Sequence, residues 1–295
     1  MSPAGLALAA LAAAAMLAAG PAAAVPPGYH LVWSDEFNSG AAPSPDKWRY
    51  DTWRNHDGWF NGEAQYYSAD RPANARIDNG QLIIEARPER LTQYPDYGGQ
   101  AYSSARLITD GTARWTYGFF EIRARLSCAR GAWPAIWLMG ENWPAGGEID
   151  IMEQLGFDPG TVYGTAHTPW SVAHHTPSGA AARISSPCTA FHRYQVEWTA
   201  DAVTFLIDDV PYHTYHRPAD GTPQTWPFDQ PEYMILNVAV GGGWAGQKGI
   251  DDSALPDGMA VDYVRVYQRS SAIRKSGYHY WLRRTRFSFA HPRFG

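Results

Sequence analysis

The chain has 295 residues, a formal net charge of -5 and 45% hydrophobic residues, which argues against an intrinsically disordered chain. The weakly acidic balance gives no reason to expect a nucleic-acid partner, and the length suits one large β or α/β domain. Thirteen tryptophans are more than one core usually needs. The surplus suggests flat aromatic surfaces that stack against sugar rings, although core packing is the default interpretation for each tryptophan.

The N-terminal segment has the pattern of an export signal. Residues 6–20 form an uninterrupted apolar run, and three alanines follow at 22–24. This run is too short for a comfortable membrane span and precedes a small-residue cleavage site. An uncleaved anchor is the alternative, because residues 1–5 carry no basic side chain. We expect a signal peptide over 1–24, a mature chain from Val25, secretion to the extracellular space and no membrane-spanning segment.

The body of the chain, residues 25–268, alternates apolar and polar side chains with period two. The alternation is clear over 120–126, 193–198 and 263–267, and Asp78-Asn79-Gly80 has the composition of a hairpin turn. There is no convincing 3.6-residue period that would supply crossover helices. The pattern predicts an all-β sandwich as a single domain.

The last segment, residues 269–295, differs in composition from the body. It carries seven basic residues and no acidic one, and it shows no clear strand alternation. We expect a flexible basic tail, with a polyanion-binding or cell-wall-binding arm as the alternative.

The chain contains two cysteines, Cys128 and Cys188, and neither belongs to a zinc-binding pattern. Export permits a disulfide, and two cysteines allow one intramolecular pairing. Two free buried thiols are the alternative.

The segment Gly147-Glu148-Ile149-Asp150-Ile151-Met152-Glu153 carries three carboxylates within six residues. On a regular strand Glu153 would face the core together with the two isoleucines, and a charged group is costly there. One extra residue, a β-bulge near Ile151-Met152, would return Glu153 to the face of Glu148 and Asp150. We therefore predict a bulge at this position.

Three carboxylates on one face repel one another, so at least one pKa should be raised. A retaining glycosidase needs such a set, with one ionised nucleophile and one protonated acid/base. Asp150, between Glu148 and Glu153, is placed to share a proton with the nucleophile. A surface acidic strand or a calcium loop is the alternative, although calcium loops usually bring Gly and Asn into the ligand run.

Several segments together resemble glycoside hydrolase family 16. They are W-P-A-I-W-L at 133–138, G-E-I-D-I-M-E at 147–153, W-S-D-E-F at 33–37, N-G-E-A-Q-Y-Y at 61–67, Y-G-F-F-E-I-R at 117–123, V-A-V-G-G at 238–242 and V-D-Y-V-R-V-Y at 261–267. The resemblance covers about residues 30–268. The bulged spacing with Met152 resembles the laminarinase-like members, which cleave β-1,3-glucan.

The resemblance implies a β-jelly-roll sandwich of two antiparallel sheets with a concave substrate cleft. It implies that Glu148 is the nucleophile, Glu153 the acid/base and Asp150 their helper. The residues that match substrate-binding positions are Asn61, Glu63, Arg106, Trp133, Trp137, His167 and Trp244. Trp133 and Trp137 are four apart on one predicted strand and share a face. For each of these residues a structural role in the core or at the surface is the alternative.

The resemblance also implies a structural calcium ion held by the Asp262 side chain and the carbonyls of Glu36 and Gly80, with no cofactor for catalysis. The expected function is that of a secreted, monomeric, retaining endo-β-1,3-glucanase. A relative acting on mixed-linkage β-glucan or on a galactan such as agarose is one alternative. A non-catalytic β-glucan recognition protein is another, although such proteins typically lose the carboxylates that this chain keeps.

Overall fold

The computed structural model describes residues 25–219 and 221–270. The predicted signal peptide, 1–24, lies outside the described residues, as does the predicted tail from residue 271 onward. Arg269, which we assigned to the tail, belongs to the last strand, where it pairs with Tyr29. Within the described ranges no helix is long and apolar enough to cross a membrane.

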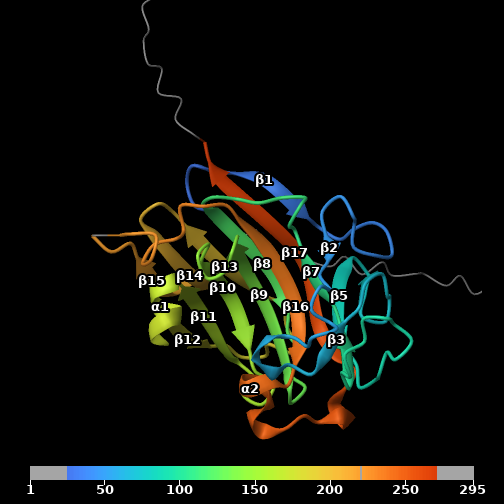
Figure 1. The fold of residues 1–295 in the computed structure, drawn as a ribbon. Helices are drawn as coiled ribbons and strands as arrows, with labels where there is room; N and C mark the ends of the chain where they lie inside the picture. The colour runs from blue at the N-terminus through green and yellow to red at the C-terminus, as the bar shows by residue number, and fades with distance from the viewer. Residues whose placement is uncertain (1–24, 220, 271–295) are drawn as a thin grey trace, which may run out of the picture.

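Two large antiparallel sheets form the body of the protein (Figure 1). The first contains, in spatial order, β15 (Val210–His216), β14 (Ala202–Ile207), β13 (His192–Trp198), β8 (Gly118–Arg125), β17 (Asp257–Arg269), β5 (Gln81–Ala86) and β4 (Ala75–Asp78), with β1 (Tyr29–Asp35) also paired to β17. The second contains β12 (Ser178–Arg183), β11 (Thr161–His167), β10 (Glu148–Gln154), β9 (Ala132–Gly140), β16 (Glu232–Val240), β7 (Arg106–Ile108) and β2 (Arg49–Tyr50). The predicted sandwich of antiparallel sheets is confirmed.

The remaining elements are short. β3 (Gln65–Tyr67) and β6 (Tyr102–Ser104) form a two-stranded parallel pair, which the sequence pattern did not predict. The described helical segments are α1 (Pro169–His174), α2 (Gly242–Ala245), η1 (Phe60–Gly62), η2 (Gly246–Lys248) and η3 (Asp252–Ala254). The predicted hairpin is present, because Asp78 pairs with Gln81 and both Asn79 and Gly80 have positive φ, as a two-residue turn requires.

The core lies between the two sheets and follows the alternation along each strand. Ile122 and Val264 from the first sheet meet Ile136 and Leu236 from the second in one buried cluster. On the second sheet the intervening side chains point away from this core. Burial of one face therefore leaves the other face of the second sheet free to carry polar and aromatic side chains.

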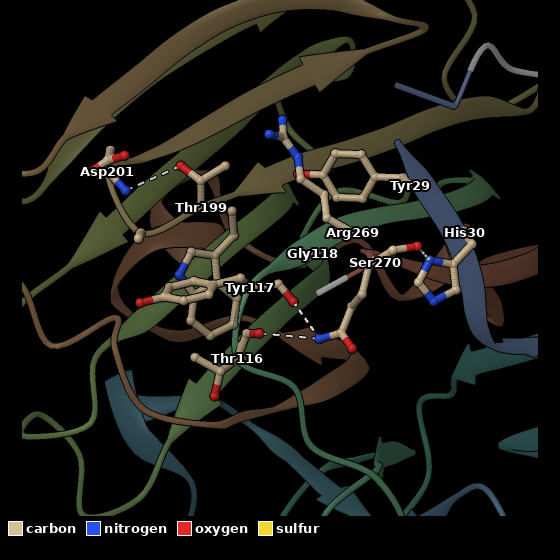
Figure 2. A pocket seen from close by; sticks show the side chains of 12 residues that line it. Tyr29, His30, Thr116, Tyr117, Gly118, Thr199, Asp201, Arg269 and Ser270 are labelled. Atoms are coloured by element: carbon tan, nitrogen blue, oxygen red, sulfur yellow. Dashed lines mark hydrogen bonds between the residues drawn. The ribbon is translucent and has the colours of Figure 1, made fainter. Parts of the chain in front are cut away.

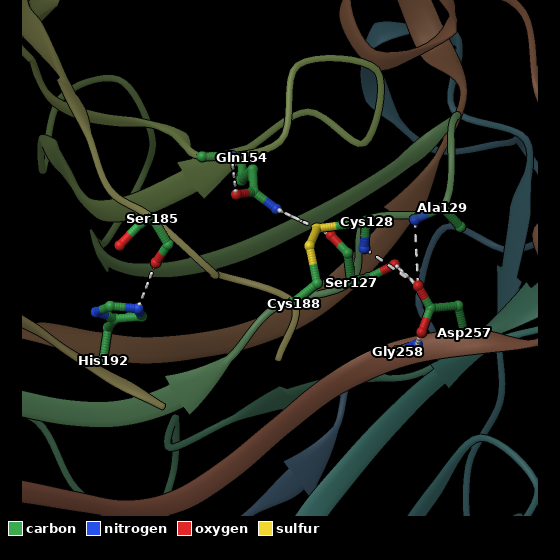
Figure 3. The surroundings of a disulfide bond; sticks show 10 residues. Ser127, Cys128, Ala129, Gln154, Ser185, Cys188, His192, Asp257 and Gly258 are labelled. Carbon is green, nitrogen blue, oxygen red and sulfur yellow. Dashed lines mark hydrogen bonds between the residues drawn. A yellow bond between two sulfur atoms is a disulfide. The ribbon is translucent and has the colours of Figure 1, made fainter. Parts of the chain in front are cut away.

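A disulfide joins Cys128, after β8, to Cys188, before β13, so the predicted pairing is confirmed (Figure 3). The backbone beside it is held by Asp257, whose carboxylate accepts hydrogen bonds from the Ser127 hydroxyl and the Cys128 amide. Gln154, the last residue of β10, donates to the Ser127 carbonyl at 3.0 Å. The cross-link thus lies against the end of the carboxylate-bearing strand.

Candidate active site

The register of β10 contains the predicted irregularity. Asp150 lies opposite Trp137 of β9, whereas Met152 lies opposite Ile136 and Glu153 opposite Ala135, so one extra residue of β10 is accommodated. The pairing with β11 shifts in the same interval. Such a shift is the signature of a β-bulge, and the predicted bulge is confirmed.

The bulge separates apolar from acidic side chains. Ile151 and Met152 are consecutive, yet both are fully buried in the core between the sheets. Glu148, Asp150 and Glu153 all line a cleft of about 810 Å³ on the opposite face. A regular strand would have directed Glu153 into the core, where ionising it is costly.

His167 reaches the carboxylates from β11, where it lies opposite Glu148. Its Nε2 atom is 3.0 Å from Oδ2 of Asp150 and 4.0 Å from Oε1 of Glu148. Glu148, Asp150 and His167 place one ligand-type atom each within 4.8 Å of one another. Among the described residues, these three side chains form the group that could hold a divalent cation. Their closeness also allows them to share protons.

Burial raises the pKa of all three carboxyl groups, and repulsion by neighbouring carboxylates raises it further for Glu148 and Glu153. Burial, followed by the charge of Asp150, raises the pKa of Glu148 to about 8, and burial raises the pKa of Asp150 to about 7. Burial, with the charges of Asp150 and Glu148, holds the pKa of Glu153 well above its ordinary value. The hydrogen bond between Glu148 and Asp150 raises the first pKa and lowers the second, as expected when Glu148 donates.

Aromatic side chains bound the carboxylates on one side. Trp133 donates its Nε1 proton to Oε1 of Glu153 at 3.0 Å, and the rings of Trp133 and Trp244 are nearly perpendicular with centroids 5.3 Å apart. Trp137 donates to Oδ1 of Asn237 at 2.8 Å. Both strand tryptophans line the cleft, as predicted, although Trp133 is also largely buried.

Arg106 is fixed by a buried ion pair. Its Nε donates to Oδ2 of Asp51 at 2.8 Å, and both side chains are about nine-tenths buried. The guanidinium lies 5.2 Å from the centroid of Trp59 and 4.7 Å from that of Trp137. The two aromatic rings and the carboxylate therefore hold the guanidinium so that its remaining N–H groups can donate hydrogen bonds to a ligand in the cleft.

Asn61 and Glu63 enter the cleft from the loop that contains η1. Asn61 adopts a left-handed backbone with φ of 59° and donates to Glu63 at 3.3 Å, and Gln65 donates to the other carboxylate oxygen at 2.9 Å. Burial raises the pKa of Glu63 above its ordinary value. All seven predicted binding residues thus line the same cleft as the three carboxylates.

The sequence reasoning missed several residues that line this cleft. They are Trp53, Trp59, Phe60, Met139, Tyr233 and Asn237. Asn237 had a readable signal, because it is the one amide in the apolar run Tyr233–Val240 and therefore marks the open face of β16. Trp53, Trp59 and Phe60 lie in an irregular loop, where no period assigns a face.

A second hollow, of about 760 Å³, lies where β1 begins and β17 ends (Figure 2). It is lined by Tyr29, Tyr117 and Arg269 among others, and Asp201 is the single carboxylate among its described lining residues. The Gln268 side chain spans it by donating to the carbonyls of Thr116 and Tyr117. The described lining of this hollow therefore holds no carboxylate pair for acid–base hydrolysis.

The predicted calcium ligands lie near one another, but their carboxylates already have partners. Asp35 pairs with Val264 and Val261 pairs with Leu82, a register that brings Asp262 beside Glu36 and Gly80. The Asp262 carboxylate accepts from Arg123 at 2.5 Å, and Glu36 binds Arg265 through both oxygens. The backbone carbonyls and the second Asp262 oxygen would suit calcium, so this site stays a prediction.

A row of three carboxyl groups with raised pKa values, in an aromatic-lined cleft on a β-sandwich, is the arrangement expected of a glycoside hydrolase. A sequence model of the glycosyl hydrolases family 16 matches residues 62–265. The chain belongs to this family, and it is a glycoside hydrolase whose two-carboxylate chemistry requires no cofactor.

Named relatives agree with the family assignment. The chain is 46% identical over 254 residues to a beta-glucanase of Rhodothermus marinus, covering 82% of this chain and 86% of the relative. It superposes on the crystal structure of SCLam, a non-specific endo-beta-1,3(4)-glucanase, with a TM-score of 0.82, 52% identity and coverage of 84% of this chain and 94% of that one. The laminarinase structure from Rhodothermus marinus gives a TM-score of 0.76 at 45% identity, covering 81% of this chain and 97% of that one. The predicted family and its jelly-roll fold are confirmed.

Proposed function

We propose that this glycoside hydrolase is a secreted endo-β-1,3-glucanase that cleaves laminarin-type glucans with retention of configuration. The observation that carries the proposal is the bulge in β10, because it aligns Glu148, Asp150 and Glu153 along one open cleft. An open cleft that contacts a chain along its length favours cleavage within the polymer. The laminarinase and beta-glucanase relatives support β-1,3-glucan as the substrate.

In the first step the Glu148 carboxylate attacks the anomeric carbon while Glu153 gives its proton to the glycosidic oxygen. The bond to the leaving sugar breaks, and a covalent glycosyl-enzyme forms. Glu148 must be ionised to attack, so the proton that it shares with Asp150 has to move to Asp150. His167, 3.0 Å from Asp150, is placed to balance the charge of this pair.

In the second step Glu153, now ionised, removes a proton from water, and the oxygen of that water attacks the anomeric carbon. The bond to Glu148 breaks and the carboxylate is restored. Two displacements at the same carbon return the original configuration, and Glu153 regains the proton that it donated. The Trp133 N–H stabilises the ionised form of Glu153 between the two steps.

The direct test is release of reducing sugar from laminarin, lichenan and agarose under the same conditions. We expect rapid release from laminarin and none from agarose. Lichenan cleavage at a comparable rate would favour the second candidate, a mixed-linkage β-glucanase, which the name of the 52% identical SCLam structure supports. Binding of laminarin without release of sugar from any of the three would instead indicate a recognition protein and overturn the proposal.

The two catalytic roles are tested by Glu148→Ala and Glu153→Ala. Loss of the acid/base should lower turnover by about 100- to 10,000-fold, and loss of the nucleophile at least as much. Azide should rescue both variants but yield opposite anomers, since it replaces the nucleophile in one and the attacking water in the other. NMR of the glycosyl azides distinguishes the two roles, and absence of rescue in both would contradict the assignment.

We also propose that the protein acts as a monomer and that calcium, where bound by Asp262 and the carbonyls of Glu36 and Gly80, has a structural role away from the carboxylates. A carboxylate oxygen and two carbonyls are ligands that calcium prefers. Addition of calcium to chelator-treated protein should raise its thermal unfolding temperature, and Asp262→Ala should abolish that rise. Light scattering coupled to gel filtration measures the oligomeric state.

A further inference from the structure

The cleft extends well beyond the carboxylates, to a rim of exposed aromatic side chains. Of the large apolar side chains that are exposed in the described part of the chain, Trp53, Phe60 and Trp143 line the cleft. Trp53 is 65% exposed and Phe60 54% exposed, and both belong to the loop between β2 and β3. Exposed apolar area gathered at one rim of a binding cleft is typical of a contact surface.

Neighbouring side chains hold the aromatic rings of this rim in place. The Arg54 guanidinium lies 5.3 Å from the centroid of Trp53 and 4.4 Å from that of Phe60, and its Nε donates to the Gly58 carbonyl at 2.9 Å. The two rings are tilted by 58° with centroids 6.1 Å apart. One cation thus holds both rings in a fixed relation, which lowers the entropy cost of binding a ligand.

The loop is also anchored from below. Trp53 meets the buried Trp59 edge to face at 6.4 Å, and Trp59 donates its Nε1 proton to Oδ1 of Asn55 at 2.9 Å. Asn55 is fully buried and bonds the backbone of Tyr67 in both directions. The aromatic faces at the rim are therefore kept in solvent by a rigid base.

A continuous track connects the rim to the carboxylates. Trp59 lies against Arg106, Arg106 against Trp137, and Trp137 lies opposite Asp150. Four strand positions separate β10 from β2 in the sheet, which is about 19 Å at about 4.8 Å per strand. The loop that carries the rim thus begins after β2, at the far edge of the sheet from β10.

We propose that Trp53 and Phe60, held by Arg54, form an outer subsite that grips a β-glucan chain several units from the bond that is cleaved. The inference rests on the proposed glucanase function. The rings supply flat apolar faces for the C–H faces of sugar rings, and Arg54 supplies N–H donors for hydroxyl groups. The subsite favours long chains because short oligosaccharides that occupy the carboxylate region do not reach it.

The test compares kcat/KM for polymeric β-1,3-glucan with kcat/KM for the shortest oligosaccharide that the wild type cleaves. In Trp53→Ala the ratio of the two values should fall about tenfold, from loss of one stacking surface. Phe60→Ala should change the ratio in the same direction. Trp170→Ala is the matched control, since Trp170 is 47% exposed on α1 and does not line the cleft, and it should leave the ratio unchanged.

A second measurement uses the Glu148→Gln background, in which oligosaccharides bind without being consumed. Affinity should rise with chain length until the chain reaches the rim, and Trp53→Ala should remove the last increment. An unchanged ratio in Trp53→Ala and Phe60→Ala, or an equal loss on short and long substrates, would overturn the outer subsite. Failure of the wild type to cleave any β-glucan would instead overturn the glucanase function itself.

Discussion

Asp150 couples the titration of the two glutamates that flank it. Burial raises the pKa of both Glu148 and Glu153, and the charge of Asp150 raises both further. Activity requires Glu148 ionised and Glu153 protonated, so the first pKa sets the acid limb of the pH profile and the second sets the alkaline limb.

We therefore expect Asp150→Asn to move both limbs of the kcat/KM profile to lower pH. Removing the negative charge makes ionisation of each glutamate easier, so each pKa falls toward its ordinary value. Steady-state kinetics across the pH range, with wild type measured in the same buffers, checks this. A lower rate with both limbs unmoved would show that Asp150 acts through geometry and not through charge.

At the residue scale the sequence predicted the site well where reactive side chains lie in a strand with a clear apolar–polar alternation. Glu148, Asp150 and Glu153 were identified because three carboxylates in an apolar strand conflict with burial unless the strand is irregular. Trp53 and Phe60 were not identified, because no periodic pattern in the sequence indicates which side chains an exposed aromatic residue in a loop will contact. Their role follows from Arg54 and Trp59, which meet them through the fold of the loop.

At the scale of elements, β16 begins with a carboxyl group that the site does not use. Glu232 is fully buried, and both of its side-chain oxygens lack a hydrogen-bond partner among the described residues. Burial, with added repulsion from Glu148 and Asp150, holds the pKa of Glu232 well above its ordinary value. The folded protein therefore keeps this proton at a pH where the unfolded chain has lost it.

Glu232→Gln should accordingly stabilise the protein more at pH 7 than at pH 5. The wild type loses free energy of unfolding as pH rises above about 4.5, by up to about 1.4 kcal/mol per pH unit from this group, and glutamine does not ionise. Urea unfolding of both proteins at the two pH values measures the difference. An equal difference at both pH values would mean that Glu232 is not protonated in the folded state.

The strands themselves were largely predictable from alternation, since one face of each sheet is buried in the common core. The Asn79-Gly80 turn was predictable because its positive φ angles restrict the residue types. The parallel pairing of β3 with β6 was not, because it joins segments 37 residues apart in sequence, Gln65 with Tyr102, through tertiary contacts. The local propensities of these residues therefore do not indicate the pairing.

For the whole molecule, the disulfide is the longest covalent constraint. It joins residues 60 apart and so closes a loop that includes β9, β10 and β11. The loop-entropy relation gives a stabilisation of about 4 kcal/mol for a loop of this length. For a domain of this size each kcal/mol shifts Tm by about 2–4 °C.

The Cys128→Ser, Cys188→Ser double variant should therefore melt about 10 °C lower than the wild type. Calorimetry of the variant and the wild type under oxidising conditions measures the shift, and wild type melted in the presence of a reductant should show a similar loss. A shift under about 2 °C would indicate that the loop is already restrained in the unfolded chain.

The bulge in β10 also determines which residue spacings along the catalytic strand place side chains on the same face. Side chains on one face of a regular strand are an even number of residues apart, yet Glu148 and Glu153 are separated by an odd number and share a face. A chain one residue shorter here keeps its carboxylates together only by losing the bulge as well. Deletion of Ile151 or Met152 thus removes the bulge and leaves all three carboxylates on one face. Deletion of Ile149, on the regular side of the bulge, would instead turn Glu148 to the face opposite Asp150 and Glu153.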